Sequence, residues 1–120
     1  MTRPLRMDIE GGWYHITSRG NNRQDIFLDD SDRKHFLELL GEYRKRYGVE
    51  IHAYVLMDNH YHLIVRTPEA NVSAAMHWLN VSYSVWWNRK HQRSGHVLQG
   101  RFRGVIIEEG GWVRQTSLYV

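Results

Sequence analysis

Two kinds of hydrophobic spacing alternate along this sequence, and their order is the feature that most limits the fold. Three short runs are rich in β-branched and aromatic residues, as strands are: residues 12–19, 50–56 and 60–66. The last two are joined by Met57, Asp58 and Asn59, a connection short enough for a hairpin. We therefore predict a first strand, followed later in the chain by a pair of antiparallel strands.

Two longer segments repeat their apolar residues at helical spacing. The first begins near Asp30 or Ser31, either of which can cap a helix, and ends at Gly48; its apolar positions are Phe36, Leu40, Tyr43 and Tyr47. The second begins after Asn71, another capping residue, and keeps the period through Val72, Ala75, Met76, Leu79, Tyr83, Trp86 and Trp87. A tryptophan pair on such a helix is better explained as core than as a platform for stacking bases.

The remaining C-terminal segment predicts one more strand, at about residues 97–108, before Gly110 and Gly111 interrupt it. From Trp112 onward we expect the start of a C-terminal helix carrying Tyr119. The order of elements predicts an α+β, ferredoxin-like fold: an antiparallel four-stranded sheet with helices on one face (β-α-β-β-α-β). The opposite face of the sheet is then open for a functional site.

Composition limits the chemistry that the chain can use. It has no cysteine, so a bound metal would need histidine and oxygen ligands. Sixteen Lys and Arg against 13 Asp and Glu give a net charge of +3, which permits a polyanionic partner without requiring one. The N-terminus lacks an apolar signal-peptide stretch, and no apolar run reaches the roughly 20 residues that cross a bilayer. We expect a cytoplasmic protein with no membrane partner.

The strongest local signal is His60-Tyr61-His62, which lies inside a predicted strand. Residues two apart in a strand project from the same face, so the two imidazoles point the same way and are suited to bind a divalent metal. Taken alone, a pair of partly exposed histidines on a strand is the commoner explanation. The flanking sequence is needed to decide.

The flanking sequence resembles that of the single-tyrosine HUH transposases of insertion sequences, in which two histidines flank a usually hydrophobic residue. Here Tyr61 takes the middle place. The resemblance extends to Arg19-Gly20-Asn21-Asn22-Arg23, to Gln99-Gly100-Arg101-Phe102-Arg103 and to Ser117-Leu118-Tyr119-Val120, and together these are similar to the REP-associated tyrosine transposase branch. The match implies a single HUH domain over residues 1–120, truncated at its C-terminus relative to the family.

The resemblance also implies a reaction and the residues that carry it out. His60 and His62 would bind Mg²⁺ or Mn²⁺, and Tyr119 would be the nucleophile that forms a 5′-phosphotyrosine intermediate with single-stranded or hairpin DNA during transposition. Arginine forks pair well with phosphates, and the match brings two arginine-containing segments near the site. The expected DNA-binding residues are Arg19, Asn21, Arg23, Arg101 and Arg103.

Several alternatives stay open at this point. Tyr119 is also explained as a packing residue, and relatives carry a third metal ligand beyond it, a role for which Glu108 or Glu109 is a weak substitute. The protein is alternatively a non-catalytic single-stranded nucleic-acid-binding module, or a replication-initiator or relaxase-type nickase that shares the chemistry. The sequence also leaves a homodimer open.

Overall fold

The computed structural model describes residues 8–107 and the backbone of residues 113–119. The elements along the chain are β1 (Gly12–Arg19), a short 3₁₀ helix η1 (Asn21–Arg23), α1 (Asp30–Tyr47), β2 (Glu50–Leu56), β3 (His60–Thr67), α2 (Val72–His91), β4 (Arg103–Ile107) and β5 (Val113–Tyr119).

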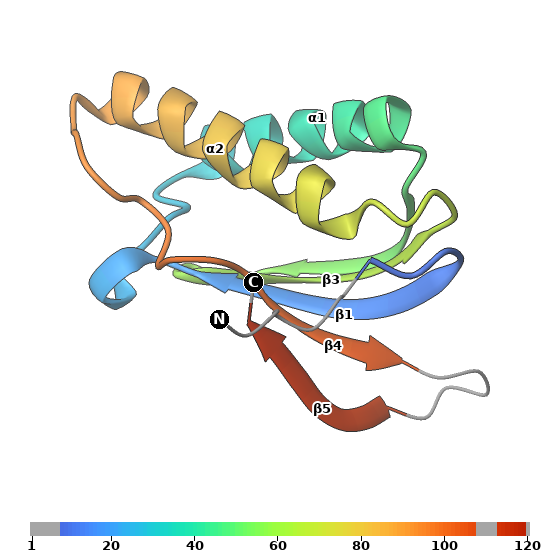
Figure 1. The fold of residues 1–120 in the computed structure, drawn as a ribbon. Coiled ribbons are helices and arrows are strands. Elements are labelled where there is room, and N and C mark those ends of the chain that lie inside the picture. Colours follow the sequence, from blue (N-terminus) through green and yellow to red (C-terminus); the bar gives the residue numbers. More distant parts are fainter. Residues whose placement is uncertain (1–7, 108–112, 120) are drawn as a thin grey trace.

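The described strands form one antiparallel sheet in the order β2-β3-β1-β4-β5, and both helices lie on one face of it (Figure 1). Strands β1 to β4 with α1 and α2 confirm the predicted ferredoxin-like α+β fold. Apart from the added fifth strand, the described chain therefore follows the order of elements that the hydrophobic spacing predicts.

Strand alternation separates the core from the open face. In β3, Tyr61, Leu63 and Val65 are fully buried toward the helices, whereas His60 and His62 between them are only partly buried. β1 repeats the pattern, with Tyr14 and Ile16 buried and the residues between them half-exposed. Because successive side chains of a strand point to opposite faces, these two central strands place a polar surface directly behind an apolar core.

The helix boundaries depend on caps that differ from the predicted ones. α1 is capped by Asp29, whose side chain accepts a hydrogen bond from the Asp32 backbone N–H, and it ends at Gly48 in the left-handed conformation. Asn71 does precede α2, but its amide donates to the carbonyl of Tyr47 instead of capping the helix. It therefore ties the start of α2 to the end of α1.

The C-terminal part of the prediction needs correction. The last predicted strand is shorter than expected, since β4 begins only at Arg103. Residues 92–102 form a connector between α2 and β4, which joins the sheet through a bridge between Gly20 and Leu98. The predicted C-terminal helix carrying Tyr119 is wrong: residues 113–119 pair with β4 as strand β5. An edge strand has unpaired backbone groups along one side, and pairing with β5 satisfies those of β4. Glu108 and Glu109 lie outside the described residues.

A buried carboxylate joins the start of α1 to the end of α2. Asp32 is fully buried and accepts hydrogen bonds from the Leu28 backbone N–H, from Lys90 Nζ at 2.7 Å and from His91 Nε2 at 3.0 Å. Lys90 also donates to Asp29, and this contact holds the pKa of the Asp29 carboxyl well below its usual range. The cluster fixes the two helix ends against each other.

Replacing Asp32 with Asn should therefore lower the free energy of unfolding by about 2 kcal/mol, because the new amide presents hydrogens to groups that are themselves donors. Urea unfolding followed by circular dichroism measures the change. Asp30→Asn is the matched control, since Asp30 is exposed in the same helical turn, and it should cost no more than about 0.5 kcal/mol. Equal losses in the two variants would contradict the role of the Asp32 cluster.

Candidate active site

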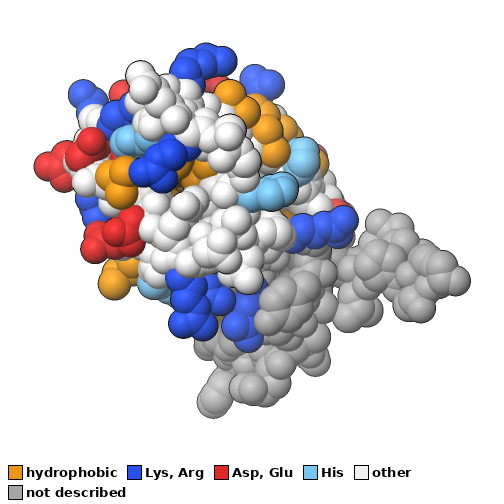
Figure 2. All heavy atoms as spheres, turned by 90° about the vertical axis from the view of Figure 1, so that its left-hand side faces the viewer, with side chains coloured by type: hydrophobic (Ala, Val, Ile, Leu, Met, Phe, Trp, Pro, Cys, Tyr) orange, Lys and Arg blue, Asp and Glu red, His pale blue; other side chains and the backbone are white. Residues whose placement is uncertain are grey.

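The face of the sheet opposite the helices carries a groove of about 760 Å³, called here the HUH groove. Its walls come from β1, β3, β4, η1 and the connector before β4, and its described lining residues include four arginines and three histidines but no Asp or Glu. The lining residues are His15, Thr17, Ser18, Arg19, Arg23, Asn59, His60, His62, Gln99, Gly100, Arg101, Arg103 and Val105. Lys and Arg side chains appear at several places on the end of the molecule that carries η1, including its lower part (Figure 2). The groove therefore suits an anionic ligand.

The two histidines of the His60-Tyr61-His62 motif lie side by side in this groove. Their ring centroids are 4.9 Å apart, with the ring planes nearly perpendicular. His60 Nδ1 is 2.8 Å from Asn59 Oδ1. When Nδ1 carries the proton, it donates a hydrogen bond to Asn59, and the lone pair of the ring lies on Nε2. Asn59 thus orients the His60 ring from the neighbouring position in the chain.

His62 is oriented from the adjacent strand. Its Nδ1 lies 3.0 Å from His15 Nε2 and 3.1 Å from Thr17 Oγ1, because β1 pairs with β3 in a register that sets Thr17 opposite His62. Burial lowers the pKa of His62, and the neighbouring His15 and His60 lower it further. With the proton on Nδ1, donated to Thr17 Oγ1 or His15 Nε2, the lone pair of the neutral ring lies on Nε2, which is then the nitrogen available to a metal.

The pair fits a divalent cation as a two-histidine site. In both rings Nδ1 is held by a neighbouring polar group, so the two Nε2 atoms are the nitrogens suited to ligation. Within the described part of the chain, no set of three His, Cys, Asp or Glu side chains converges to hold a metal ion. Phosphate oxygens and water are further ligands that Mg²⁺ and Mn²⁺ accept readily.

Two segments far apart in the sequence meet at the groove through backbone contacts. Gln99 N–H donates to the Arg19 carbonyl at 2.8 Å, and Arg19 Nε lies 3.4 Å from Gln99 Oε1. Gly20 is required at this junction, because a Cβ there would come within 2.1 Å of the Gln24 carbonyl oxygen. The junction brings Arg19 and Arg23 to the same groove as Arg101 and Arg103.

Asn21 takes a different position from the other residues expected to bind DNA. It is not among the lining residues of the HUH groove, and its backbone N–H donates to the carbonyl of Val97. It therefore helps to hold the connector against η1.

Tyr61 is a core residue with a satisfied hydroxyl. It is fully buried, as expected for the middle residue of the motif, and its hydroxyl donates to Asn80 Oδ1 on α2, while Asn80 Nδ2 donates to Ser18 Oγ on β1. Burial raises the pKa of Tyr61 far above that of an ordinary tyrosine. An aromatic residue with a polar tip is suited to this position because α2 supplies a partner for that tip.

Three polar residues of this arrangement were missed from the sequence: His15, Thr17 and Asn80. His15 and Thr17 alternate on a predicted strand, which placed them on one face, but nothing in the sequence paired that strand with residues 60–66 in this register. Asn80 looked like an ordinary polar position of a helix. The core prediction is confirmed for Trp87, which is almost fully buried, whereas Trp86 is partly buried, packs against the core and stacks on His35 with ring centroids 4.0 Å apart.

The backbone of Tyr119 belongs to a row of paired positions that crosses the sheet. The registers set His62 opposite Thr17, Thr17 opposite Arg103 and Arg103 opposite Tyr119. Adjacent strands lie about 4.8 Å apart, so the three steps separate backbone positions 62 and 119 by about 14 Å. Tyr119 therefore lies across the sheet from the histidine pair, with Thr17 and Arg103 between them.

Comparison with known proteins identifies the class of protein that this fold and groove represent. Residues 9–108 match the family model described as "Transposase IS200 like". The chain belongs to the IS200-like transposase family. No curated protein sequence matches it.

In the part of the chain that the structure describes, no helix is long and apolar enough to cross a membrane.

Two solved structures share the fold. One is a REP-associated tyrosine transposase bound to a REP hairpin, with a TM-score of 0.72 and 19% identity over 91% of this chain; the chain spans 64% of that protein's length. The other is a presumed transposase from Deinococcus radiodurans R1, with a TM-score of 0.66 and 15% identity over 90% of this chain and 88% of the other. At these identities the likeness establishes the fold alone.

Replacing Tyr61 with Phe should lower the free energy of unfolding by about 1–2 kcal/mol, because Asn80 Oδ1 loses its donor inside the structure. Tyr54→Phe is the matched control, since the Tyr54 side chain is half-exposed on the edge strand β2 and its change should be close to zero. Chemical denaturation of both variants gives the comparison. A Tyr61→Phe variant as stable as Tyr54→Phe would exclude the link through Asn80.

The pKa of His62 should lie below 6.5 in the metal-free protein, because burial and two neighbouring imidazoles disfavour its cation. A depressed folded-state pKa adds stability that is complete above the unfolded value of about 6.5 and is lost as the pH falls through and below that value. Histidine ring signals followed by NMR across this range give the titration midpoint. His15→Gln should move the midpoint back toward 6.5, and a wild-type midpoint at or above 6.5 would contradict the arrangement.

Proposed function

We propose that this chain is a metal-dependent endonuclease and strand transferase for single-stranded DNA, which forms a 5′-phosphotyrosine intermediate during transposition, as in the REP-associated tyrosine transposase branch. One observation carries the proposal. The HUH groove collects both histidines of the motif and four of the five arginine or asparagine residues expected to bind DNA, from segments up to 80 residues apart.

His60 and His62 are the proposed metal ligands, each through Nε2. When bound, Mg²⁺ or Mn²⁺ supplies Lewis-acid polarisation of a phosphate oxygen. The chain's own residues prepare the site: Asn59 orients one ring, while Thr17 and His15 orient the other. Both rings are then oriented before a metal binds.

The arginines are proposed to hold the DNA backbone. Arg103 lies in the row between the histidine pair and Tyr119, and Arg19, Arg23 and Arg101 line the same groove. Guanidinium groups pair with phosphate oxygens in a fork, so they fix the strand's position without reading its sequence. A phosphate over Thr17 and Arg103 would lie between the two groups that the reaction needs.

Tyr119 is the proposed nucleophile. Its phenolate oxygen would form a bond to phosphorus as the bond from phosphorus to the 3′ oxygen breaks, and the departing oxygen takes up a proton to become a 3′-hydroxyl. Attack by a second 3′-hydroxyl on the phosphotyrosine reverses the exchange and joins strands. The number of phosphoester bonds is unchanged in each step, so no nucleotide cofactor is required.

The other tyrosines support this choice by their placement. Burial raises the pKa of Tyr14, Tyr43, Tyr61 and Tyr83, which disfavours the phenolate that attack requires. Tyr54 is half-exposed, but it pairs with the buried Leu63 and so belongs to the helix-facing side of the sheet. Position 119 alone among the strand tyrosines shares a cross-strand row with His62.

A second function is favoured by one observation. The separation of about 14 Å between backbone positions 62 and 119 suits a module that binds single-stranded DNA on the open face without cutting it. That alternative uses the same arginines but requires neither the metal nor the tyrosine. A homodimer stays a prediction for either function.

Tyr119→Phe should abolish formation of a covalent protein–DNA adduct, because phenylalanine has no oxygen to attack phosphorus. The assay incubates a labelled hairpin oligonucleotide carrying unpaired flanks with protein and Mn²⁺, then resolves a denaturant-resistant species by gel electrophoresis. Tyr54→Phe is the control and should form the adduct normally. Chelation of the metal, or His60→Ala with His62→Ala, should abolish it as well.

The outcomes separate the two functions. An adduct that persists in Tyr119→Phe would exclude this nucleophile. No adduct in the wild type, together with oligonucleotide binding that is insensitive to chelator and to loss of the histidines, would identify the binding module instead.

A further inference from the structure

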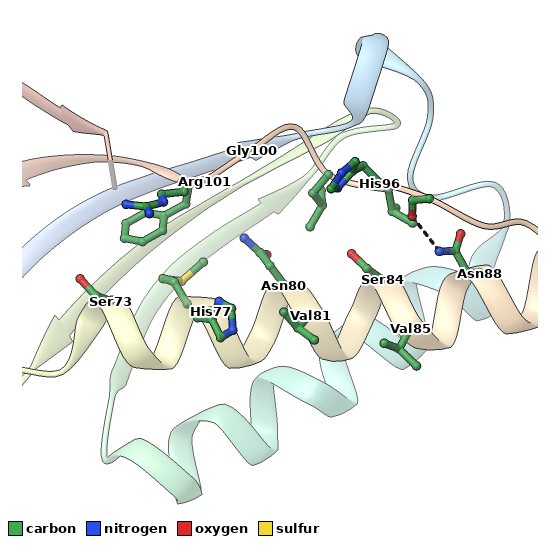
Figure 3. Close-up of a pocket in the computed structure, with 15 residues that line it drawn as sticks. Ser73, His77, Asn80, Val81, Ser84, Val85, Asn88, His96, Gly100 and Arg101 are labelled. Atoms are coloured by element: carbon green, nitrogen blue, oxygen red, sulfur yellow. Dashed lines mark hydrogen bonds between the residues drawn. The ribbon is translucent and has the colours of Figure 1, made fainter.

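A second groove lies between α2 and the connector that precedes β4, and the reaction proposed above makes no use of it. It has a volume of about 600 Å³ and is called here the α2 groove. One side of α2, from Ser73 to Asn88, faces the connector residues from Gly95 to Phe102 across it (Figure 3). In the close-up, Asn80 and Ser84 point from the helix toward the connector.

The α2 groove and the HUH groove share part of their lining. Gly100 and Arg101 line both of them, so the connector forms the shared wall. The connector is not crowded at this point: Gly100 has a φ of +47°, and a Cβ added there would meet nothing within 4 Å.

The chemistry of the α2 groove suits unpaired nucleotides. Its described lining residues carry Arg101, His77 and His96 but no Asp or Glu, so its charge is compatible with phosphate. Its exposed apolar surface comes from two valines of α2, Val81 at 46% and Val85 at 52%, and the core residues Met76, Leu98 and Phe102 lie buried behind the lining. Apolar surface beside hydrogen-bonding groups is what an unstacked base needs, whereas a phosphate chain alone needs only cations.

We propose that the α2 groove binds the unpaired nucleotides that continue from the DNA strand in the HUH groove, with Arg101 at the phosphate between the two grooves. This inference rests on the proposed function and extends it, because it assigns a place to DNA outside the reacting phosphodiester. Bases would pack against Val81 and Val85, and the polar side chains of α2 would contact their edges. Contacts to unpaired bases are the usual route by which proteins read single strands, so the groove would contribute to the choice of flanking sequence.

A chain of hydrogen bonds through Tyr61, Asn80 and Ser18 connects the linings of the two grooves. Asn80 lines the α2 groove and also accepts the hydroxyl of Tyr61, which lies between the two motif histidines in the chain. Asn80 in turn donates to Ser18, a lining residue of the HUH groove. The wall of the α2 groove is thereby held in fixed position relative to the proposed metal ligands.

The test compares DNA binding by three variants of the full chain. Val85→Glu and Val85→Lys place opposite charges in the α2 groove at a side chain that is already half-exposed, so both variants should fold. Ala74→Glu is the matched control: Ala74 is exposed on the same helix but does not line either groove. Circular dichroism and thermal melts confirm that the folded state is unchanged.

The probes are fluorescein-labelled hairpin oligonucleotides with single-stranded tails of increasing length, and fluorescence anisotropy gives the Kd in Mn²⁺. Affinity should rise with tail length. Val85→Glu should weaken binding of the long-tailed probe by about tenfold and leave the tailless probe unchanged, because like charges in a groove repel the strand. Val85→Lys should strengthen long-tail binding, and Ala74→Glu should behave as the wild type.

Arg103→Ala separates this inference from the proposed function, since Arg103 lines only the HUH groove and its loss should weaken every probe. Suppose that Arg103→Ala weakens binding, while in both Val85 variants the affinity rises with tail length as it does in the wild type. The α2 groove is then not a path for DNA, and the proposed function stands. If no probe binds in a way that depends on Arg103, the proposed function fails and this inference fails with it. Tails carrying 4-thiothymine give direct evidence, because ultraviolet cross-links to peptides containing His77 or His96 are expected only if the strand enters the α2 groove.

Discussion

The antiparallel pairing of β1 with β3 is the contact on which the rest of the structure depends. Its register sets Thr17 opposite His62 and Arg19 opposite His60, so polar partners meet on the open face at these two steps. The same pairing places Ile16 opposite Leu63 in the core. A shift of one residue would bury the histidines and expose the apolar positions, so burial of one face strongly favours this register.

The site is assembled from small contacts around that pairing. Each motif histidine has its Nδ1 held by a neighbouring polar group, by Asn59 in one ring and by Thr17 and His15 in the other. The cost of ordering these side chains is met during folding, since they lie on rigid strands with the core directly beneath them. A ligand that enters the groove therefore meets two imidazole rings whose orientation is already set.

The connector between α2 and β4 links the two grooves of the molecule. It contacts β1 through the Gln99 and Arg19 backbone, contacts η1 through the Val97 carbonyl and contacts α2 through the bond from Asn88 to Gly95. Irregular backbone of this kind must satisfy its hydrogen bonds individually, and here three different elements supply the partners. Its arginine at position 101 is consequently held at the boundary between the HUH groove and the α2 groove.

The sequence by itself determined the order of elements, the polar and apolar faces of residues 12–19 and 60–66, and the placement of His60 and His62 on one face, because these follow from local periodicity. Tertiary structure alone decided that His15 and Thr17 meet His62 and that Asn80 receives the hydroxyl of Tyr61. It also decided that residues 113–119 form a strand where a helix was predicted. The physical reason is the same in each case. A hydrogen bond between distant segments depends on which segments become neighbours in the fold, and the backbone pairing that completes an edge strand is such a bond. The local spacing of residues carries no information about which segments become neighbours.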